Sequence, residues 1–301
     1  MTINESVIDF KRYLKRRNYS PHTIKNYLHV VKHFLMWIDV PVEEVGKEQV
    51  ITYIEQQLGR KIAAKTINCQ LVGIRQFYRY LREEESLEIK APVPRGHSLR
   101  LPKPLPRYLH DEEVGLFLKV VTKKRDLAIF LVMLRCGLRV DEVAKLTLDA
   151  IYYRRSRILI SNGKGGKGRV VYFSNDAAEA LADYLDIRLV AKERKIFLVE
   201  KGPCKGQPIS VRGIQKRIEY YSKISGISVS CHQLRHTMAT QLLNADADLV
   251  TLQDLLGHTL IKTTQIYAKV SNRKVQRDYH KAMDVILQSN KGKAGGMDET
   301  Q

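Results

Sequence analysis

The chain has 301 residues, and its 51 lysines and arginines outnumber its 32 aspartates and glutamates, which gives a formal net charge of +19. This surplus favours a polyanionic partner, with nucleic acid ahead of an anionic membrane, although a merely soluble basic protein would also fit it. Because the chain has no apolar run of about 18 residues, no signal peptide and no CxxC pair among its four cysteines, we expect a cytoplasmic protein with no membrane partner.

The first 90 residues are predicted to be helical. Apolar residues recur at helical spacing over residues 4–17, through YSPHTIKNYLHVVKHFLMWI, over about 47–58 and over about 63–84. Ser20 is the expected N-cap of the second helix, and Pro21 takes its first position. These helices predict a small bundle that forms a first domain, residues 1–90.

Basic side chains lie opposite the apolar stripes of this bundle. Such residues usually form only a solvated face, but the total charge makes a DNA-facing surface an equal alternative. The candidate DNA contacts in this domain are Lys25, Lys65, Arg75 and Arg79.

Residues 91–107, APVPRGHSLRLPKPLPR, hold five of the nine prolines and four basic residues without an acidic one. Proline at this density is incompatible with helices and central strands, so we predict an extended basic linker between two domains. Its charge indicates that it lies along something anionic.

Residues 108–288 form the second predicted domain, which mixes helices with two strands. Helical patterns cover DEEVGLFLKVV, KRDLAIFLVMLRCG and RVDEVAKLTL, and later about 176–192, 211–224, 232–244, 248–256 and 260–288. Strands are expected over 155–161 and 169–173. We therefore predict a mainly α fold with a small β-sheet or hairpin in the second domain, followed by a disordered tail over 289–301.

The turn SNGKGGKGR between the two strands resembles a phosphate-binding P-loop only superficially. The pattern G-x-x-x-x-G-K-[ST] fails, because Arg169 follows Gly168 and no Ser or Thr is present to hold magnesium. What remains is a hairpin tip that presents Lys164 and Lys167, the latter a further candidate DNA contact. Lysines on such turns are usually only exposed to solvent, but a mobile lysine can also protonate a leaving group.

The helix HQLRHTMATQLL, residues 232–243, places His232, Arg235 and His236 on one side, at positions i, i+3 and i+4. Zinc is disfavoured, because HExxH would need a glutamate where Gln233 stands and because an arginine would set a fixed positive charge beside the metal. A structural histidine pair fits better. A phosphate clamp fits best, since guanidinium and imidazole together bind a charged phosphoryl group, and we expect no metal or other cofactor.

The segment LLGHTLIKTTQIYAKV places His258 directly after a helix-ending glycine and Tyr267 nine residues further on. Together with CGLRVDEVAKL, NGKGGKGR and HQLRHTMATQLL, it makes the chain resemble the tyrosine recombinases of the phage-integrase superfamily, most of all their compact Xer-like members. The resemblance covers about residues 4–285 and implies a SAM-like core-binding domain and a catalytic domain. The catalytic residues that it implies are Arg139, Lys164, His232, Arg235, His258 and Tyr267, with Glu142 and His236 in support.

The resemblance also implies the reaction. Tyr267 would attack a DNA phosphodiester to give a 3′-phosphotyrosyl intermediate and a free 5′-hydroxyl, with His232 as the proton acceptor. Lys164 would protonate the departing oxygen. Arg139 and Arg235 would neutralise the charge that develops on the phosphate without a metal.

The partners implied by the resemblance are double-stranded DNA with paired inverted elements and further copies of the chain, as a homo-tetramer that passes through a Holliday junction, with or without a second recombinase. The C-terminal segment SNRKVQRDYHKAMDVILQ either docks into a neighbouring subunit or packs on its own domain. No additional arm-type DNA-binding domain is expected. Resolution of dimers or cointegrates and movement of an element both stay open, and a non-catalytic DNA-binding relative and a type IB topoisomerase are the rival interpretations.

Overall fold

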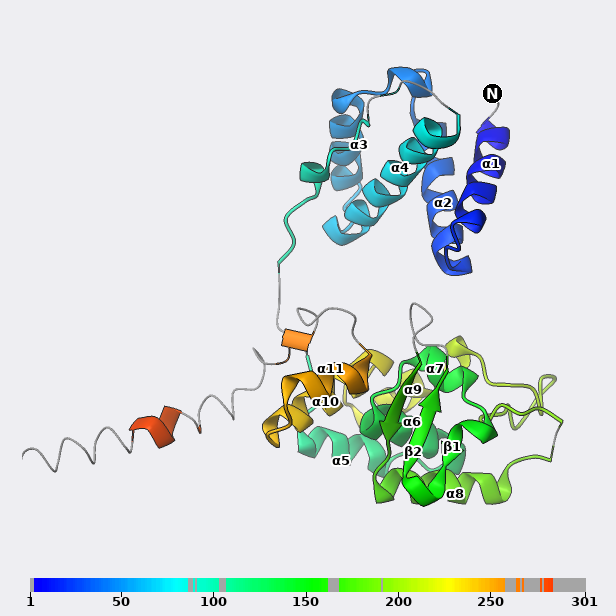
Figure 1. Ribbon diagram of the computed structural model, residues 1–301, viewed down its shortest axis with the longest axis vertical. Helices are drawn as coiled ribbons and strands as arrows, with labels where there is room; N and C mark the ends of the chain where they lie inside the picture. The colour runs from blue at the N-terminus through cyan, green and yellow to red at the C-terminus, as the bar shows by residue number, and fades with distance from the viewer. Residues whose placement is uncertain are drawn as a thin grey trace, which may run out of the picture. The chain divides into compact units, whose positions relative to one another are not determined.

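The structure is a computed structural model of the chain (Figure 1), and it describes residues 3–85, 89, 91–102, 107–161, 168–190, 192–257, 264–265, 267, 277 and 279–283. The chain divides into two compact units, Met1–Lys103 and Pro104–Gln301. The division lies inside the proline-rich segment 91–107. The tail predicted over 289–301 and most of the helix predicted over 260–288 lie outside the described residues.

The described part of the first unit is helical. Its elements are α1 (Ile3–Arg16), α2 (Pro21–Trp37), the 3-10 turn η1 (Val42–Glu44), α3 (Lys47–Gly59), α4 (Ala64–Glu84) and the 3-10 turn η2 (Arg95–His97). The helix α2 starts as predicted, since the Ser20 hydroxyl accepts a hydrogen bond from the Thr23 backbone N–H at 3.2 Å and Pro21 follows it directly. Phe10, Phe34 and Phe77 are buried where α1, α2 and α4 meet.

The second unit combines helices with a small sheet. Its elements are α5 (Asp111–Lys119), α6 (Lys124–Cys136), α7 (Val140–Lys145), η3 (Leu148–Ala150), β1 (Ile151–Tyr152), η4 (Tyr153–Arg155), β2 (Arg157–Ile160), β3 (Arg169–Tyr172), α8 (Asn175–Ile187), α9 (Val211–Ser225), α10 (Cys231–Asn244) and α11 (Leu249–Leu256). The predicted fold class, mainly α with a small sheet, is confirmed.

Two helices were predicted too long. The pattern RVDEVAKLTL extends to Leu148, whereas α7 ends at Lys145 because Leu146 takes an extended conformation. The second pattern covers about 176–192, whereas α8 ends at Ile187. The next residue, Arg188, takes an extended conformation and its guanidinium donates hydrogen bonds to the carbonyls of Glu193, Lys195 and Ile196 at 2.6, 2.8 and 2.9 Å. These bonds fix the loop that follows, and they are available only where the helix has already ended.

The sheet contains three antiparallel strands in the order β1-β2-β3. The strand β1 was not predicted, because a strand of two residues leaves no alternating pattern to detect. Ile158 faces Val171 and Ile160 faces Arg169 in the register of β2 and β3. The side chains of Ile158, Ile160 and Val171 are buried, so the sheet turns this face toward the core.

The helix α6 lies at the centre of the second unit. Nearly all of its side chains are buried, and α8, α9, α10 and β3 pack against it. Figure 1 shows α10 and α11 next to each other. Met238 of α10, Leu252 and Leu256 of α11 and Tyr267 form a smaller apolar cluster. Within the described residues, no helix is long and apolar enough to cross a membrane.

Candidate active site

The first predicted arginine stands at the start of α7. Gly137 ends α6 in the left-handed conformation, with φ of 64°, and the chain turns so that α7 begins directly after Arg139. The backbone N–H of Arg139 donates to Glu142 Oε2 at 2.8 Å, so this carboxylate caps the helix. The Arg139 guanidinium donates to Glu142 Oε1 at 3.0 Å. The two residues predicted to share a site are therefore in direct contact.

A buried carboxylate lies at the centre of this cluster. Glu142 is 5% exposed, and Arg169, the first residue of β3, donates to both of its oxygens at 2.7 and 2.8 Å. Burial alone would raise the pKa of Glu142, but the hydrogen bonds from Arg169 and from the Arg139 backbone outweigh it and lower the pKa to about 2. Glu142 is thus ionised at neutral pH and serves as the counter-charge of two guanidinium groups.

The C-terminus of α11 meets three arginines. Its last carbonyls each accept a hydrogen bond from a different guanidinium: Leu255 from Arg169 at 2.9 Å, Leu256 from Arg235 at 2.5 Å and Gly257 from Arg139 at 3.4 Å. These carbonyls have no partner within the helix and carry its partial negative charge, so cations stabilise them. The arginines therefore also hold in place the end of α11, from which the chain continues toward Tyr267.

The second predicted arginine is almost completely buried. The helix α10 begins where the Ser230 hydroxyl accepts a hydrogen bond from the Gln233 backbone N–H, and Arg235 follows in its second turn, 2% exposed. Its guanidinium also donates to the carbonyl of Gly137. Burial, together with repulsion from Arg139, lowers the pKa of Arg235 to about 10, which leaves it a cation at neutral pH.

The predicted nucleophile contacts a histidine. The hydroxyl of Tyr267, which is 2% exposed, lies 2.7 Å from His236 Nδ1, and the ring centroids of His232 and His236 are 4.3 Å apart. Burial, reinforced by His232 and Arg235, lowers the pKa of His236 to about 4, whereas burial raises the pKa of Tyr267. The contact therefore joins a neutral imidazole to a neutral tyrosine hydroxyl.

A cleft of about 470 Å³ lies beside this cluster, lined by residues of α7, α9 and α10. Arg139, His232 and Arg235 all line it, and Arg212 contributes a further cation from α9. His232 is exposed, so its ring is accessible to a bound molecule. An anion in this cleft would meet guanidinium and imidazole donors together, which suits a phosphate group.

The predicted site residues thus divide into two groups. Those that the structure brings together are Arg139, Glu142, His232, Arg235, His236 and Tyr267. Lys164, Lys167 and His258 lie outside the described residues. Within the described part of the chain, no group of three or more His, Cys, Asp or Glu side chains is arranged to hold a metal ion.

The candidate DNA contacts of the first unit also differ from one another. Lys25 and Lys65 are exposed. Arg75 donates to the carbonyls of Val93 and Pro94 at 3.1 and 3.2 Å and so holds the start of the proline-rich segment against α4. The Arg79 guanidinium is paired with Glu83 at 2.8 Å.

Arg169 belongs to the cluster, although the sequence motifs do not indicate it. In the sequence it stands out only as the residue that breaks the P-loop pattern. Glu142 and Leu255, which accept its hydrogen bonds, lie far from it along the chain, so no local pattern indicates the contact. Its position at the first residue of a strand, directly after a glycine, is the only signal that the sequence offers.

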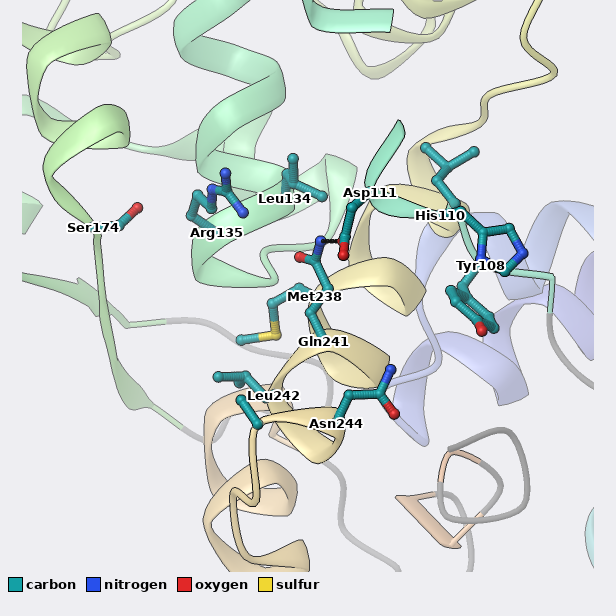
Figure 2. Close-up of a pocket in the computed structure, with 12 residues that line it drawn as sticks. Tyr108, His110, Asp111, Leu134, Arg135, Ser174, Met238, Gln241, Leu242 and Asn244 are labelled. Atoms are coloured by element: carbon teal, nitrogen blue, oxygen red, sulfur yellow. Dashed lines mark hydrogen bonds between the residues drawn. The ribbon is translucent and has the colours of Figure 1, made fainter. Parts of the chain in front are cut away.

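A second hollow of the unit has a different lining. Figure 2 shows this space, about 520 Å³, between the end of α6, the start of α5 and the C-terminal half of α10. Met238 and Leu242 give it an apolar wall, and the Gln241 side-chain amide donates to Asp111 Oδ1 at 2.7 Å across its edge. Arg139, Arg169 and Arg235 do not line it, so it is separate from the charged cleft.

Comparisons with known proteins match both units. Residues 107–274 match the phage integrase family, and residues 8–88 match the N-terminal SAM-like domain of phage integrases. Tyrosine recombinase XerA of Thermococcus kodakarensis is 31% identical over 282 residues, which cover 93% of this chain and 95% of the relative. Tyrosine recombinase XerC of Thermodesulfovibrio yellowstonii is 30% identical over 288 residues, which cover 92% and 95%.

The fold is also found in solved structures. The Tn1549 transposon integrase in complex with transposon right end DNA matches with a TM-score of 0.75 at 17% sequence identity, over 93% of this chain and 100% of that one. At this identity the likeness concerns the fold alone.

Proposed function

This chain belongs to the phage integrase family and is a tyrosine-type site-specific recombinase, and we propose that it cuts and rejoins DNA through a 3′-phosphotyrosyl bond at Tyr267. The observation that supports the proposal is that two guanidinium groups and an exposed imidazole line one cleft, while the buried Tyr267 contacts His236, the ring next to that imidazole. Each of these groups has a task in phosphodiester cleavage that needs no metal.

The arginines act on the phosphate. As phosphorus becomes five-coordinate, negative charge grows on its non-bridging oxygens, and fixed cationic donors stabilise that charge more than they stabilise the substrate. Arg139 and Arg235 line the cleft, and Glu142 and the α11 carbonyls hold their guanidinium groups before DNA binds. His258 would donate a further hydrogen bond.

Neither cleavage of the DNA strand nor its rejoining needs ATP, because each step forms one phosphoester bond as it breaks another. The Tyr267 oxygen forms a bond to phosphorus while the bond from phosphorus to the 5′-oxygen breaks. His232 takes the tyrosine proton, and Lys164 gives a proton to the departing oxygen. Because the phosphotyrosine preserves the phosphodiester bond energy, the 5′-hydroxyl of another strand can attack it and release Tyr267.

The proposed partner is double-stranded DNA with paired inverted elements. The net charge of +19 and the related integrase solved with transposon DNA support DNA as the partner. A homo-tetramer on two DNA sites, with exchange through a Holliday junction, is the proposed assembly. Its task is either resolution of dimers or cointegrates, as the Xer names of the relatives favour, or movement of a mobile element, and its place is the cytoplasm, on the DNA of its host.

Covalent trapping on DNA tests the proposal. The wild-type protein, Tyr267→Phe and Arg235→Ala are incubated with DNA fragments that flank the gene, in the presence of EDTA, and denatured in SDS. We expect a DNA-linked band for the wild type alone, and its position on the fragment locates the recombination site. A band that persists in Tyr267→Phe or in Arg235→Ala, or that vanishes with EDTA, would overturn the assignment.

A second measurement separates this function from its rivals. Two DNA segments that carry the trapped site should exchange strands, whereas a type IB topoisomerase would only relax a supercoiled plasmid. A non-catalytic relative would bind the site and give neither product.

A further inference from the structure

We propose that Arg169 is a positioning residue of this site, which keeps the Arg139 guanidinium available to the scissile phosphate by occupying the Glu142 carboxylate. The inference rests on the proposed function and names a residue that the predicted catalytic set did not contain. Arg169 does not line the cleft, and its side chain is 9% exposed, so it acts through its neighbours and not on the DNA.

The contacts of Arg169 join three elements. From the start of β3 its guanidinium reaches both oxygens of Glu142 on α7, and its Nε donates to the carbonyl of Leu255 on α11. All three nitrogens of the guanidinium group are therefore bonded within the protein. The bidentate pair fixes the orientation of the carboxylate, because the two parallel N–H···O bonds define a plane.

The chain leaves room for this arrangement at Gly257. A Cβ atom built on Gly257 would lie 2.9 Å from Arg169 Cδ, closer than real Cβ contacts allow. Gly257 also has a φ of 60°, a left-handed conformation that residues with a side chain rarely adopt. The glycine thus both ends α11 and makes space for the aliphatic part of the arginine.

The distances show how Glu142 is shared between its two arginines. Arg169 holds the carboxylate at 2.7 and 2.8 Å, whereas the Arg139 side chain makes one longer bond of 3.0 Å. The Arg139 side chain is also the more exposed, at 22%, and lines the cleft. Without Arg169, Arg139 would be the one of these two arginines left to neutralise the buried Glu142 carboxylate. The carboxylate would then draw the Arg139 guanidinium away from the cleft.

Arg169 also connects the site to the β2–β3 turn. It pairs with Ile160 as the outermost pair of the register between the two strands, and the turn between these strands carries Lys164. Anchoring of Arg169 to Glu142 therefore fixes the base of the turn relative to the two clamp arginines. A displaced anchor would affect the general acid and the phosphate clamp together.

The test compares three variants with a matched control. Arg169→Met removes the charge but keeps an aliphatic stem beside Gly257, and Arg169→Lys keeps the charge without the bidentate geometry. The double variant Arg169→Met with Glu142→Gln removes the carboxylate that would capture Arg139. The control is Arg217→Met, because Arg217 donates to the fully buried Asp126 at 2.7 Å, a carboxylate that also has two arginine partners but does not line the cleft.

Each variant is assayed on the DNA fragment that traps the wild type, at saturating protein, for the rate of phosphotyrosyl formation and separately for DNA affinity. We expect Arg169→Met to slow the covalent step by about 100-fold, as the loss of one charge-stabilising donor does elsewhere, with a change in affinity below about 3-fold. Arg169→Lys should fall between this variant and the wild type. The double variant should recover about 10-fold of the lost rate, and Arg217→Met should cleave at the wild-type rate.

Two results would overturn the inference. A purely structural role predicts that rate and melting temperature fall together in Arg169→Met and in Arg217→Met alike. It also predicts that Glu142→Gln worsens the first variant, since it removes a further buried partner. If the wild type itself forms no phosphotyrosyl bond with any DNA fragment, the proposed function fails first, and the inference fails with it.

Discussion

The hydroxyl of Tyr267 lies 2.7 Å from Nδ1 of His236, one helical turn beyond the histidine expected to take its proton. Burial lowers the pKa of His236 to about 4 and raises the pKa of Tyr267, so the proton stays on the tyrosine oxygen. We expect His236 to accept the hydrogen bond of this hydroxyl and so to orient the proposed nucleophile, while its low pKa makes it a weak base for removing the proton. Proton removal is the role proposed for His232, whose ring lies beside that of His236.

Removal of this acceptor should slow cleavage modestly. We expect His236→Ala to slow phosphotyrosyl formation by about 5- to 10-fold, the equivalent of about 1 kcal/mol for one neutral hydrogen bond. His236→Asn should retain most of the rate, because the Asn side-chain oxygen can stand near the position of Nδ1. Rapid-quench measurement of the covalent complex at saturating protein checks both, and equal losses in the two variants would contradict an acceptor role.

The same histidine should make the fold sensitive to acid. Its pKa is about 4 in the folded chain and near 6.5 when unfolded, mainly because burial disfavours the charged ring. Between these values the unfolded chain binds the proton that the folded chain excludes, so stability falls as the pH drops from about 6.5 toward 4. His236→Gln removes this term.

Urea denaturation at pH 7 and at pH 5 measures the effect. The free energy of unfolding of His236→Gln, relative to that of the wild type, should be higher at pH 5 than at pH 7, because the variant lacks the loss of stability that His236 causes in acid. A difference that is constant between the two pH values would mean that His236 does not titrate in this window. The Glu142 carboxylate, with its pKa of about 2, loses its contribution only below about pH 4.5 and does not interfere at pH 5.

The sequence was most informative where a pattern is local. Helical periodicity, the Ser20 cap and the glycine-rich turn predicted the fold class, which is confirmed, whereas the short strand β1 and the end of α8 depend on partners elsewhere in the chain. The motifs also placed Arg139 beside Glu142, three residues apart. The contacts of Arg169 with Glu142 and of His236 with Tyr267 could not be predicted, because tertiary packing alone brings these side chains together.

Substitution of Gly257, the glycine that ends α11, should destabilise the protein more than the same substitution at a helix-ending glycine with open space around it. Gly257→Ala must place a Cβ atom 2.9 Å from Arg169 Cδ at a φ of 60°. We expect it to lower the free energy of unfolding by about 1–2 kcal/mol for the conformation and by a further 1–3 kcal/mol for the overlap. It should also slow cleavage, since the overlap displaces Arg169.

Gly226→Ala is the matched control. Gly226 ends α9 with a φ of 72°, but a Cβ atom there meets nothing within 4 Å. This variant should show only the conformational part of the cost and no loss of cleavage rate. Equal destabilisation by the two substitutions in urea would mean that Arg169 moves aside without cost, against the close packing described above.

The exposed lysines of the first unit should contribute to DNA affinity more than the paired arginine does. Lys25 and Lys65 are exposed, whereas Arg79 is bonded to Glu83, a carboxylate that also accepts hydrogen bonds from Tyr13 and Arg17. If each lysine neutralises one phosphate, Lys25→Ala and Lys65→Ala should each reduce the slope of log affinity against log salt by about 1. Arg79→Ala should change the slope by less, because the arginine must first give up its carboxylate.

Fluorescence anisotropy with a labelled duplex at several salt concentrations gives these slopes. The comparison depends on the slope and not on the affinity at one salt concentration, because a substitution that merely loosens the bundle lowers affinity without removing a phosphate contact. If Arg79→Ala reduces the slope as much as Lys25→Ala does, the pair with Glu83 opens on DNA binding, as exposed ion pairs can at little cost. If neither lysine changes the slope, the DNA lies against another face of this unit, and the basic side chains of α2 and α4 only form a solvent-exposed surface.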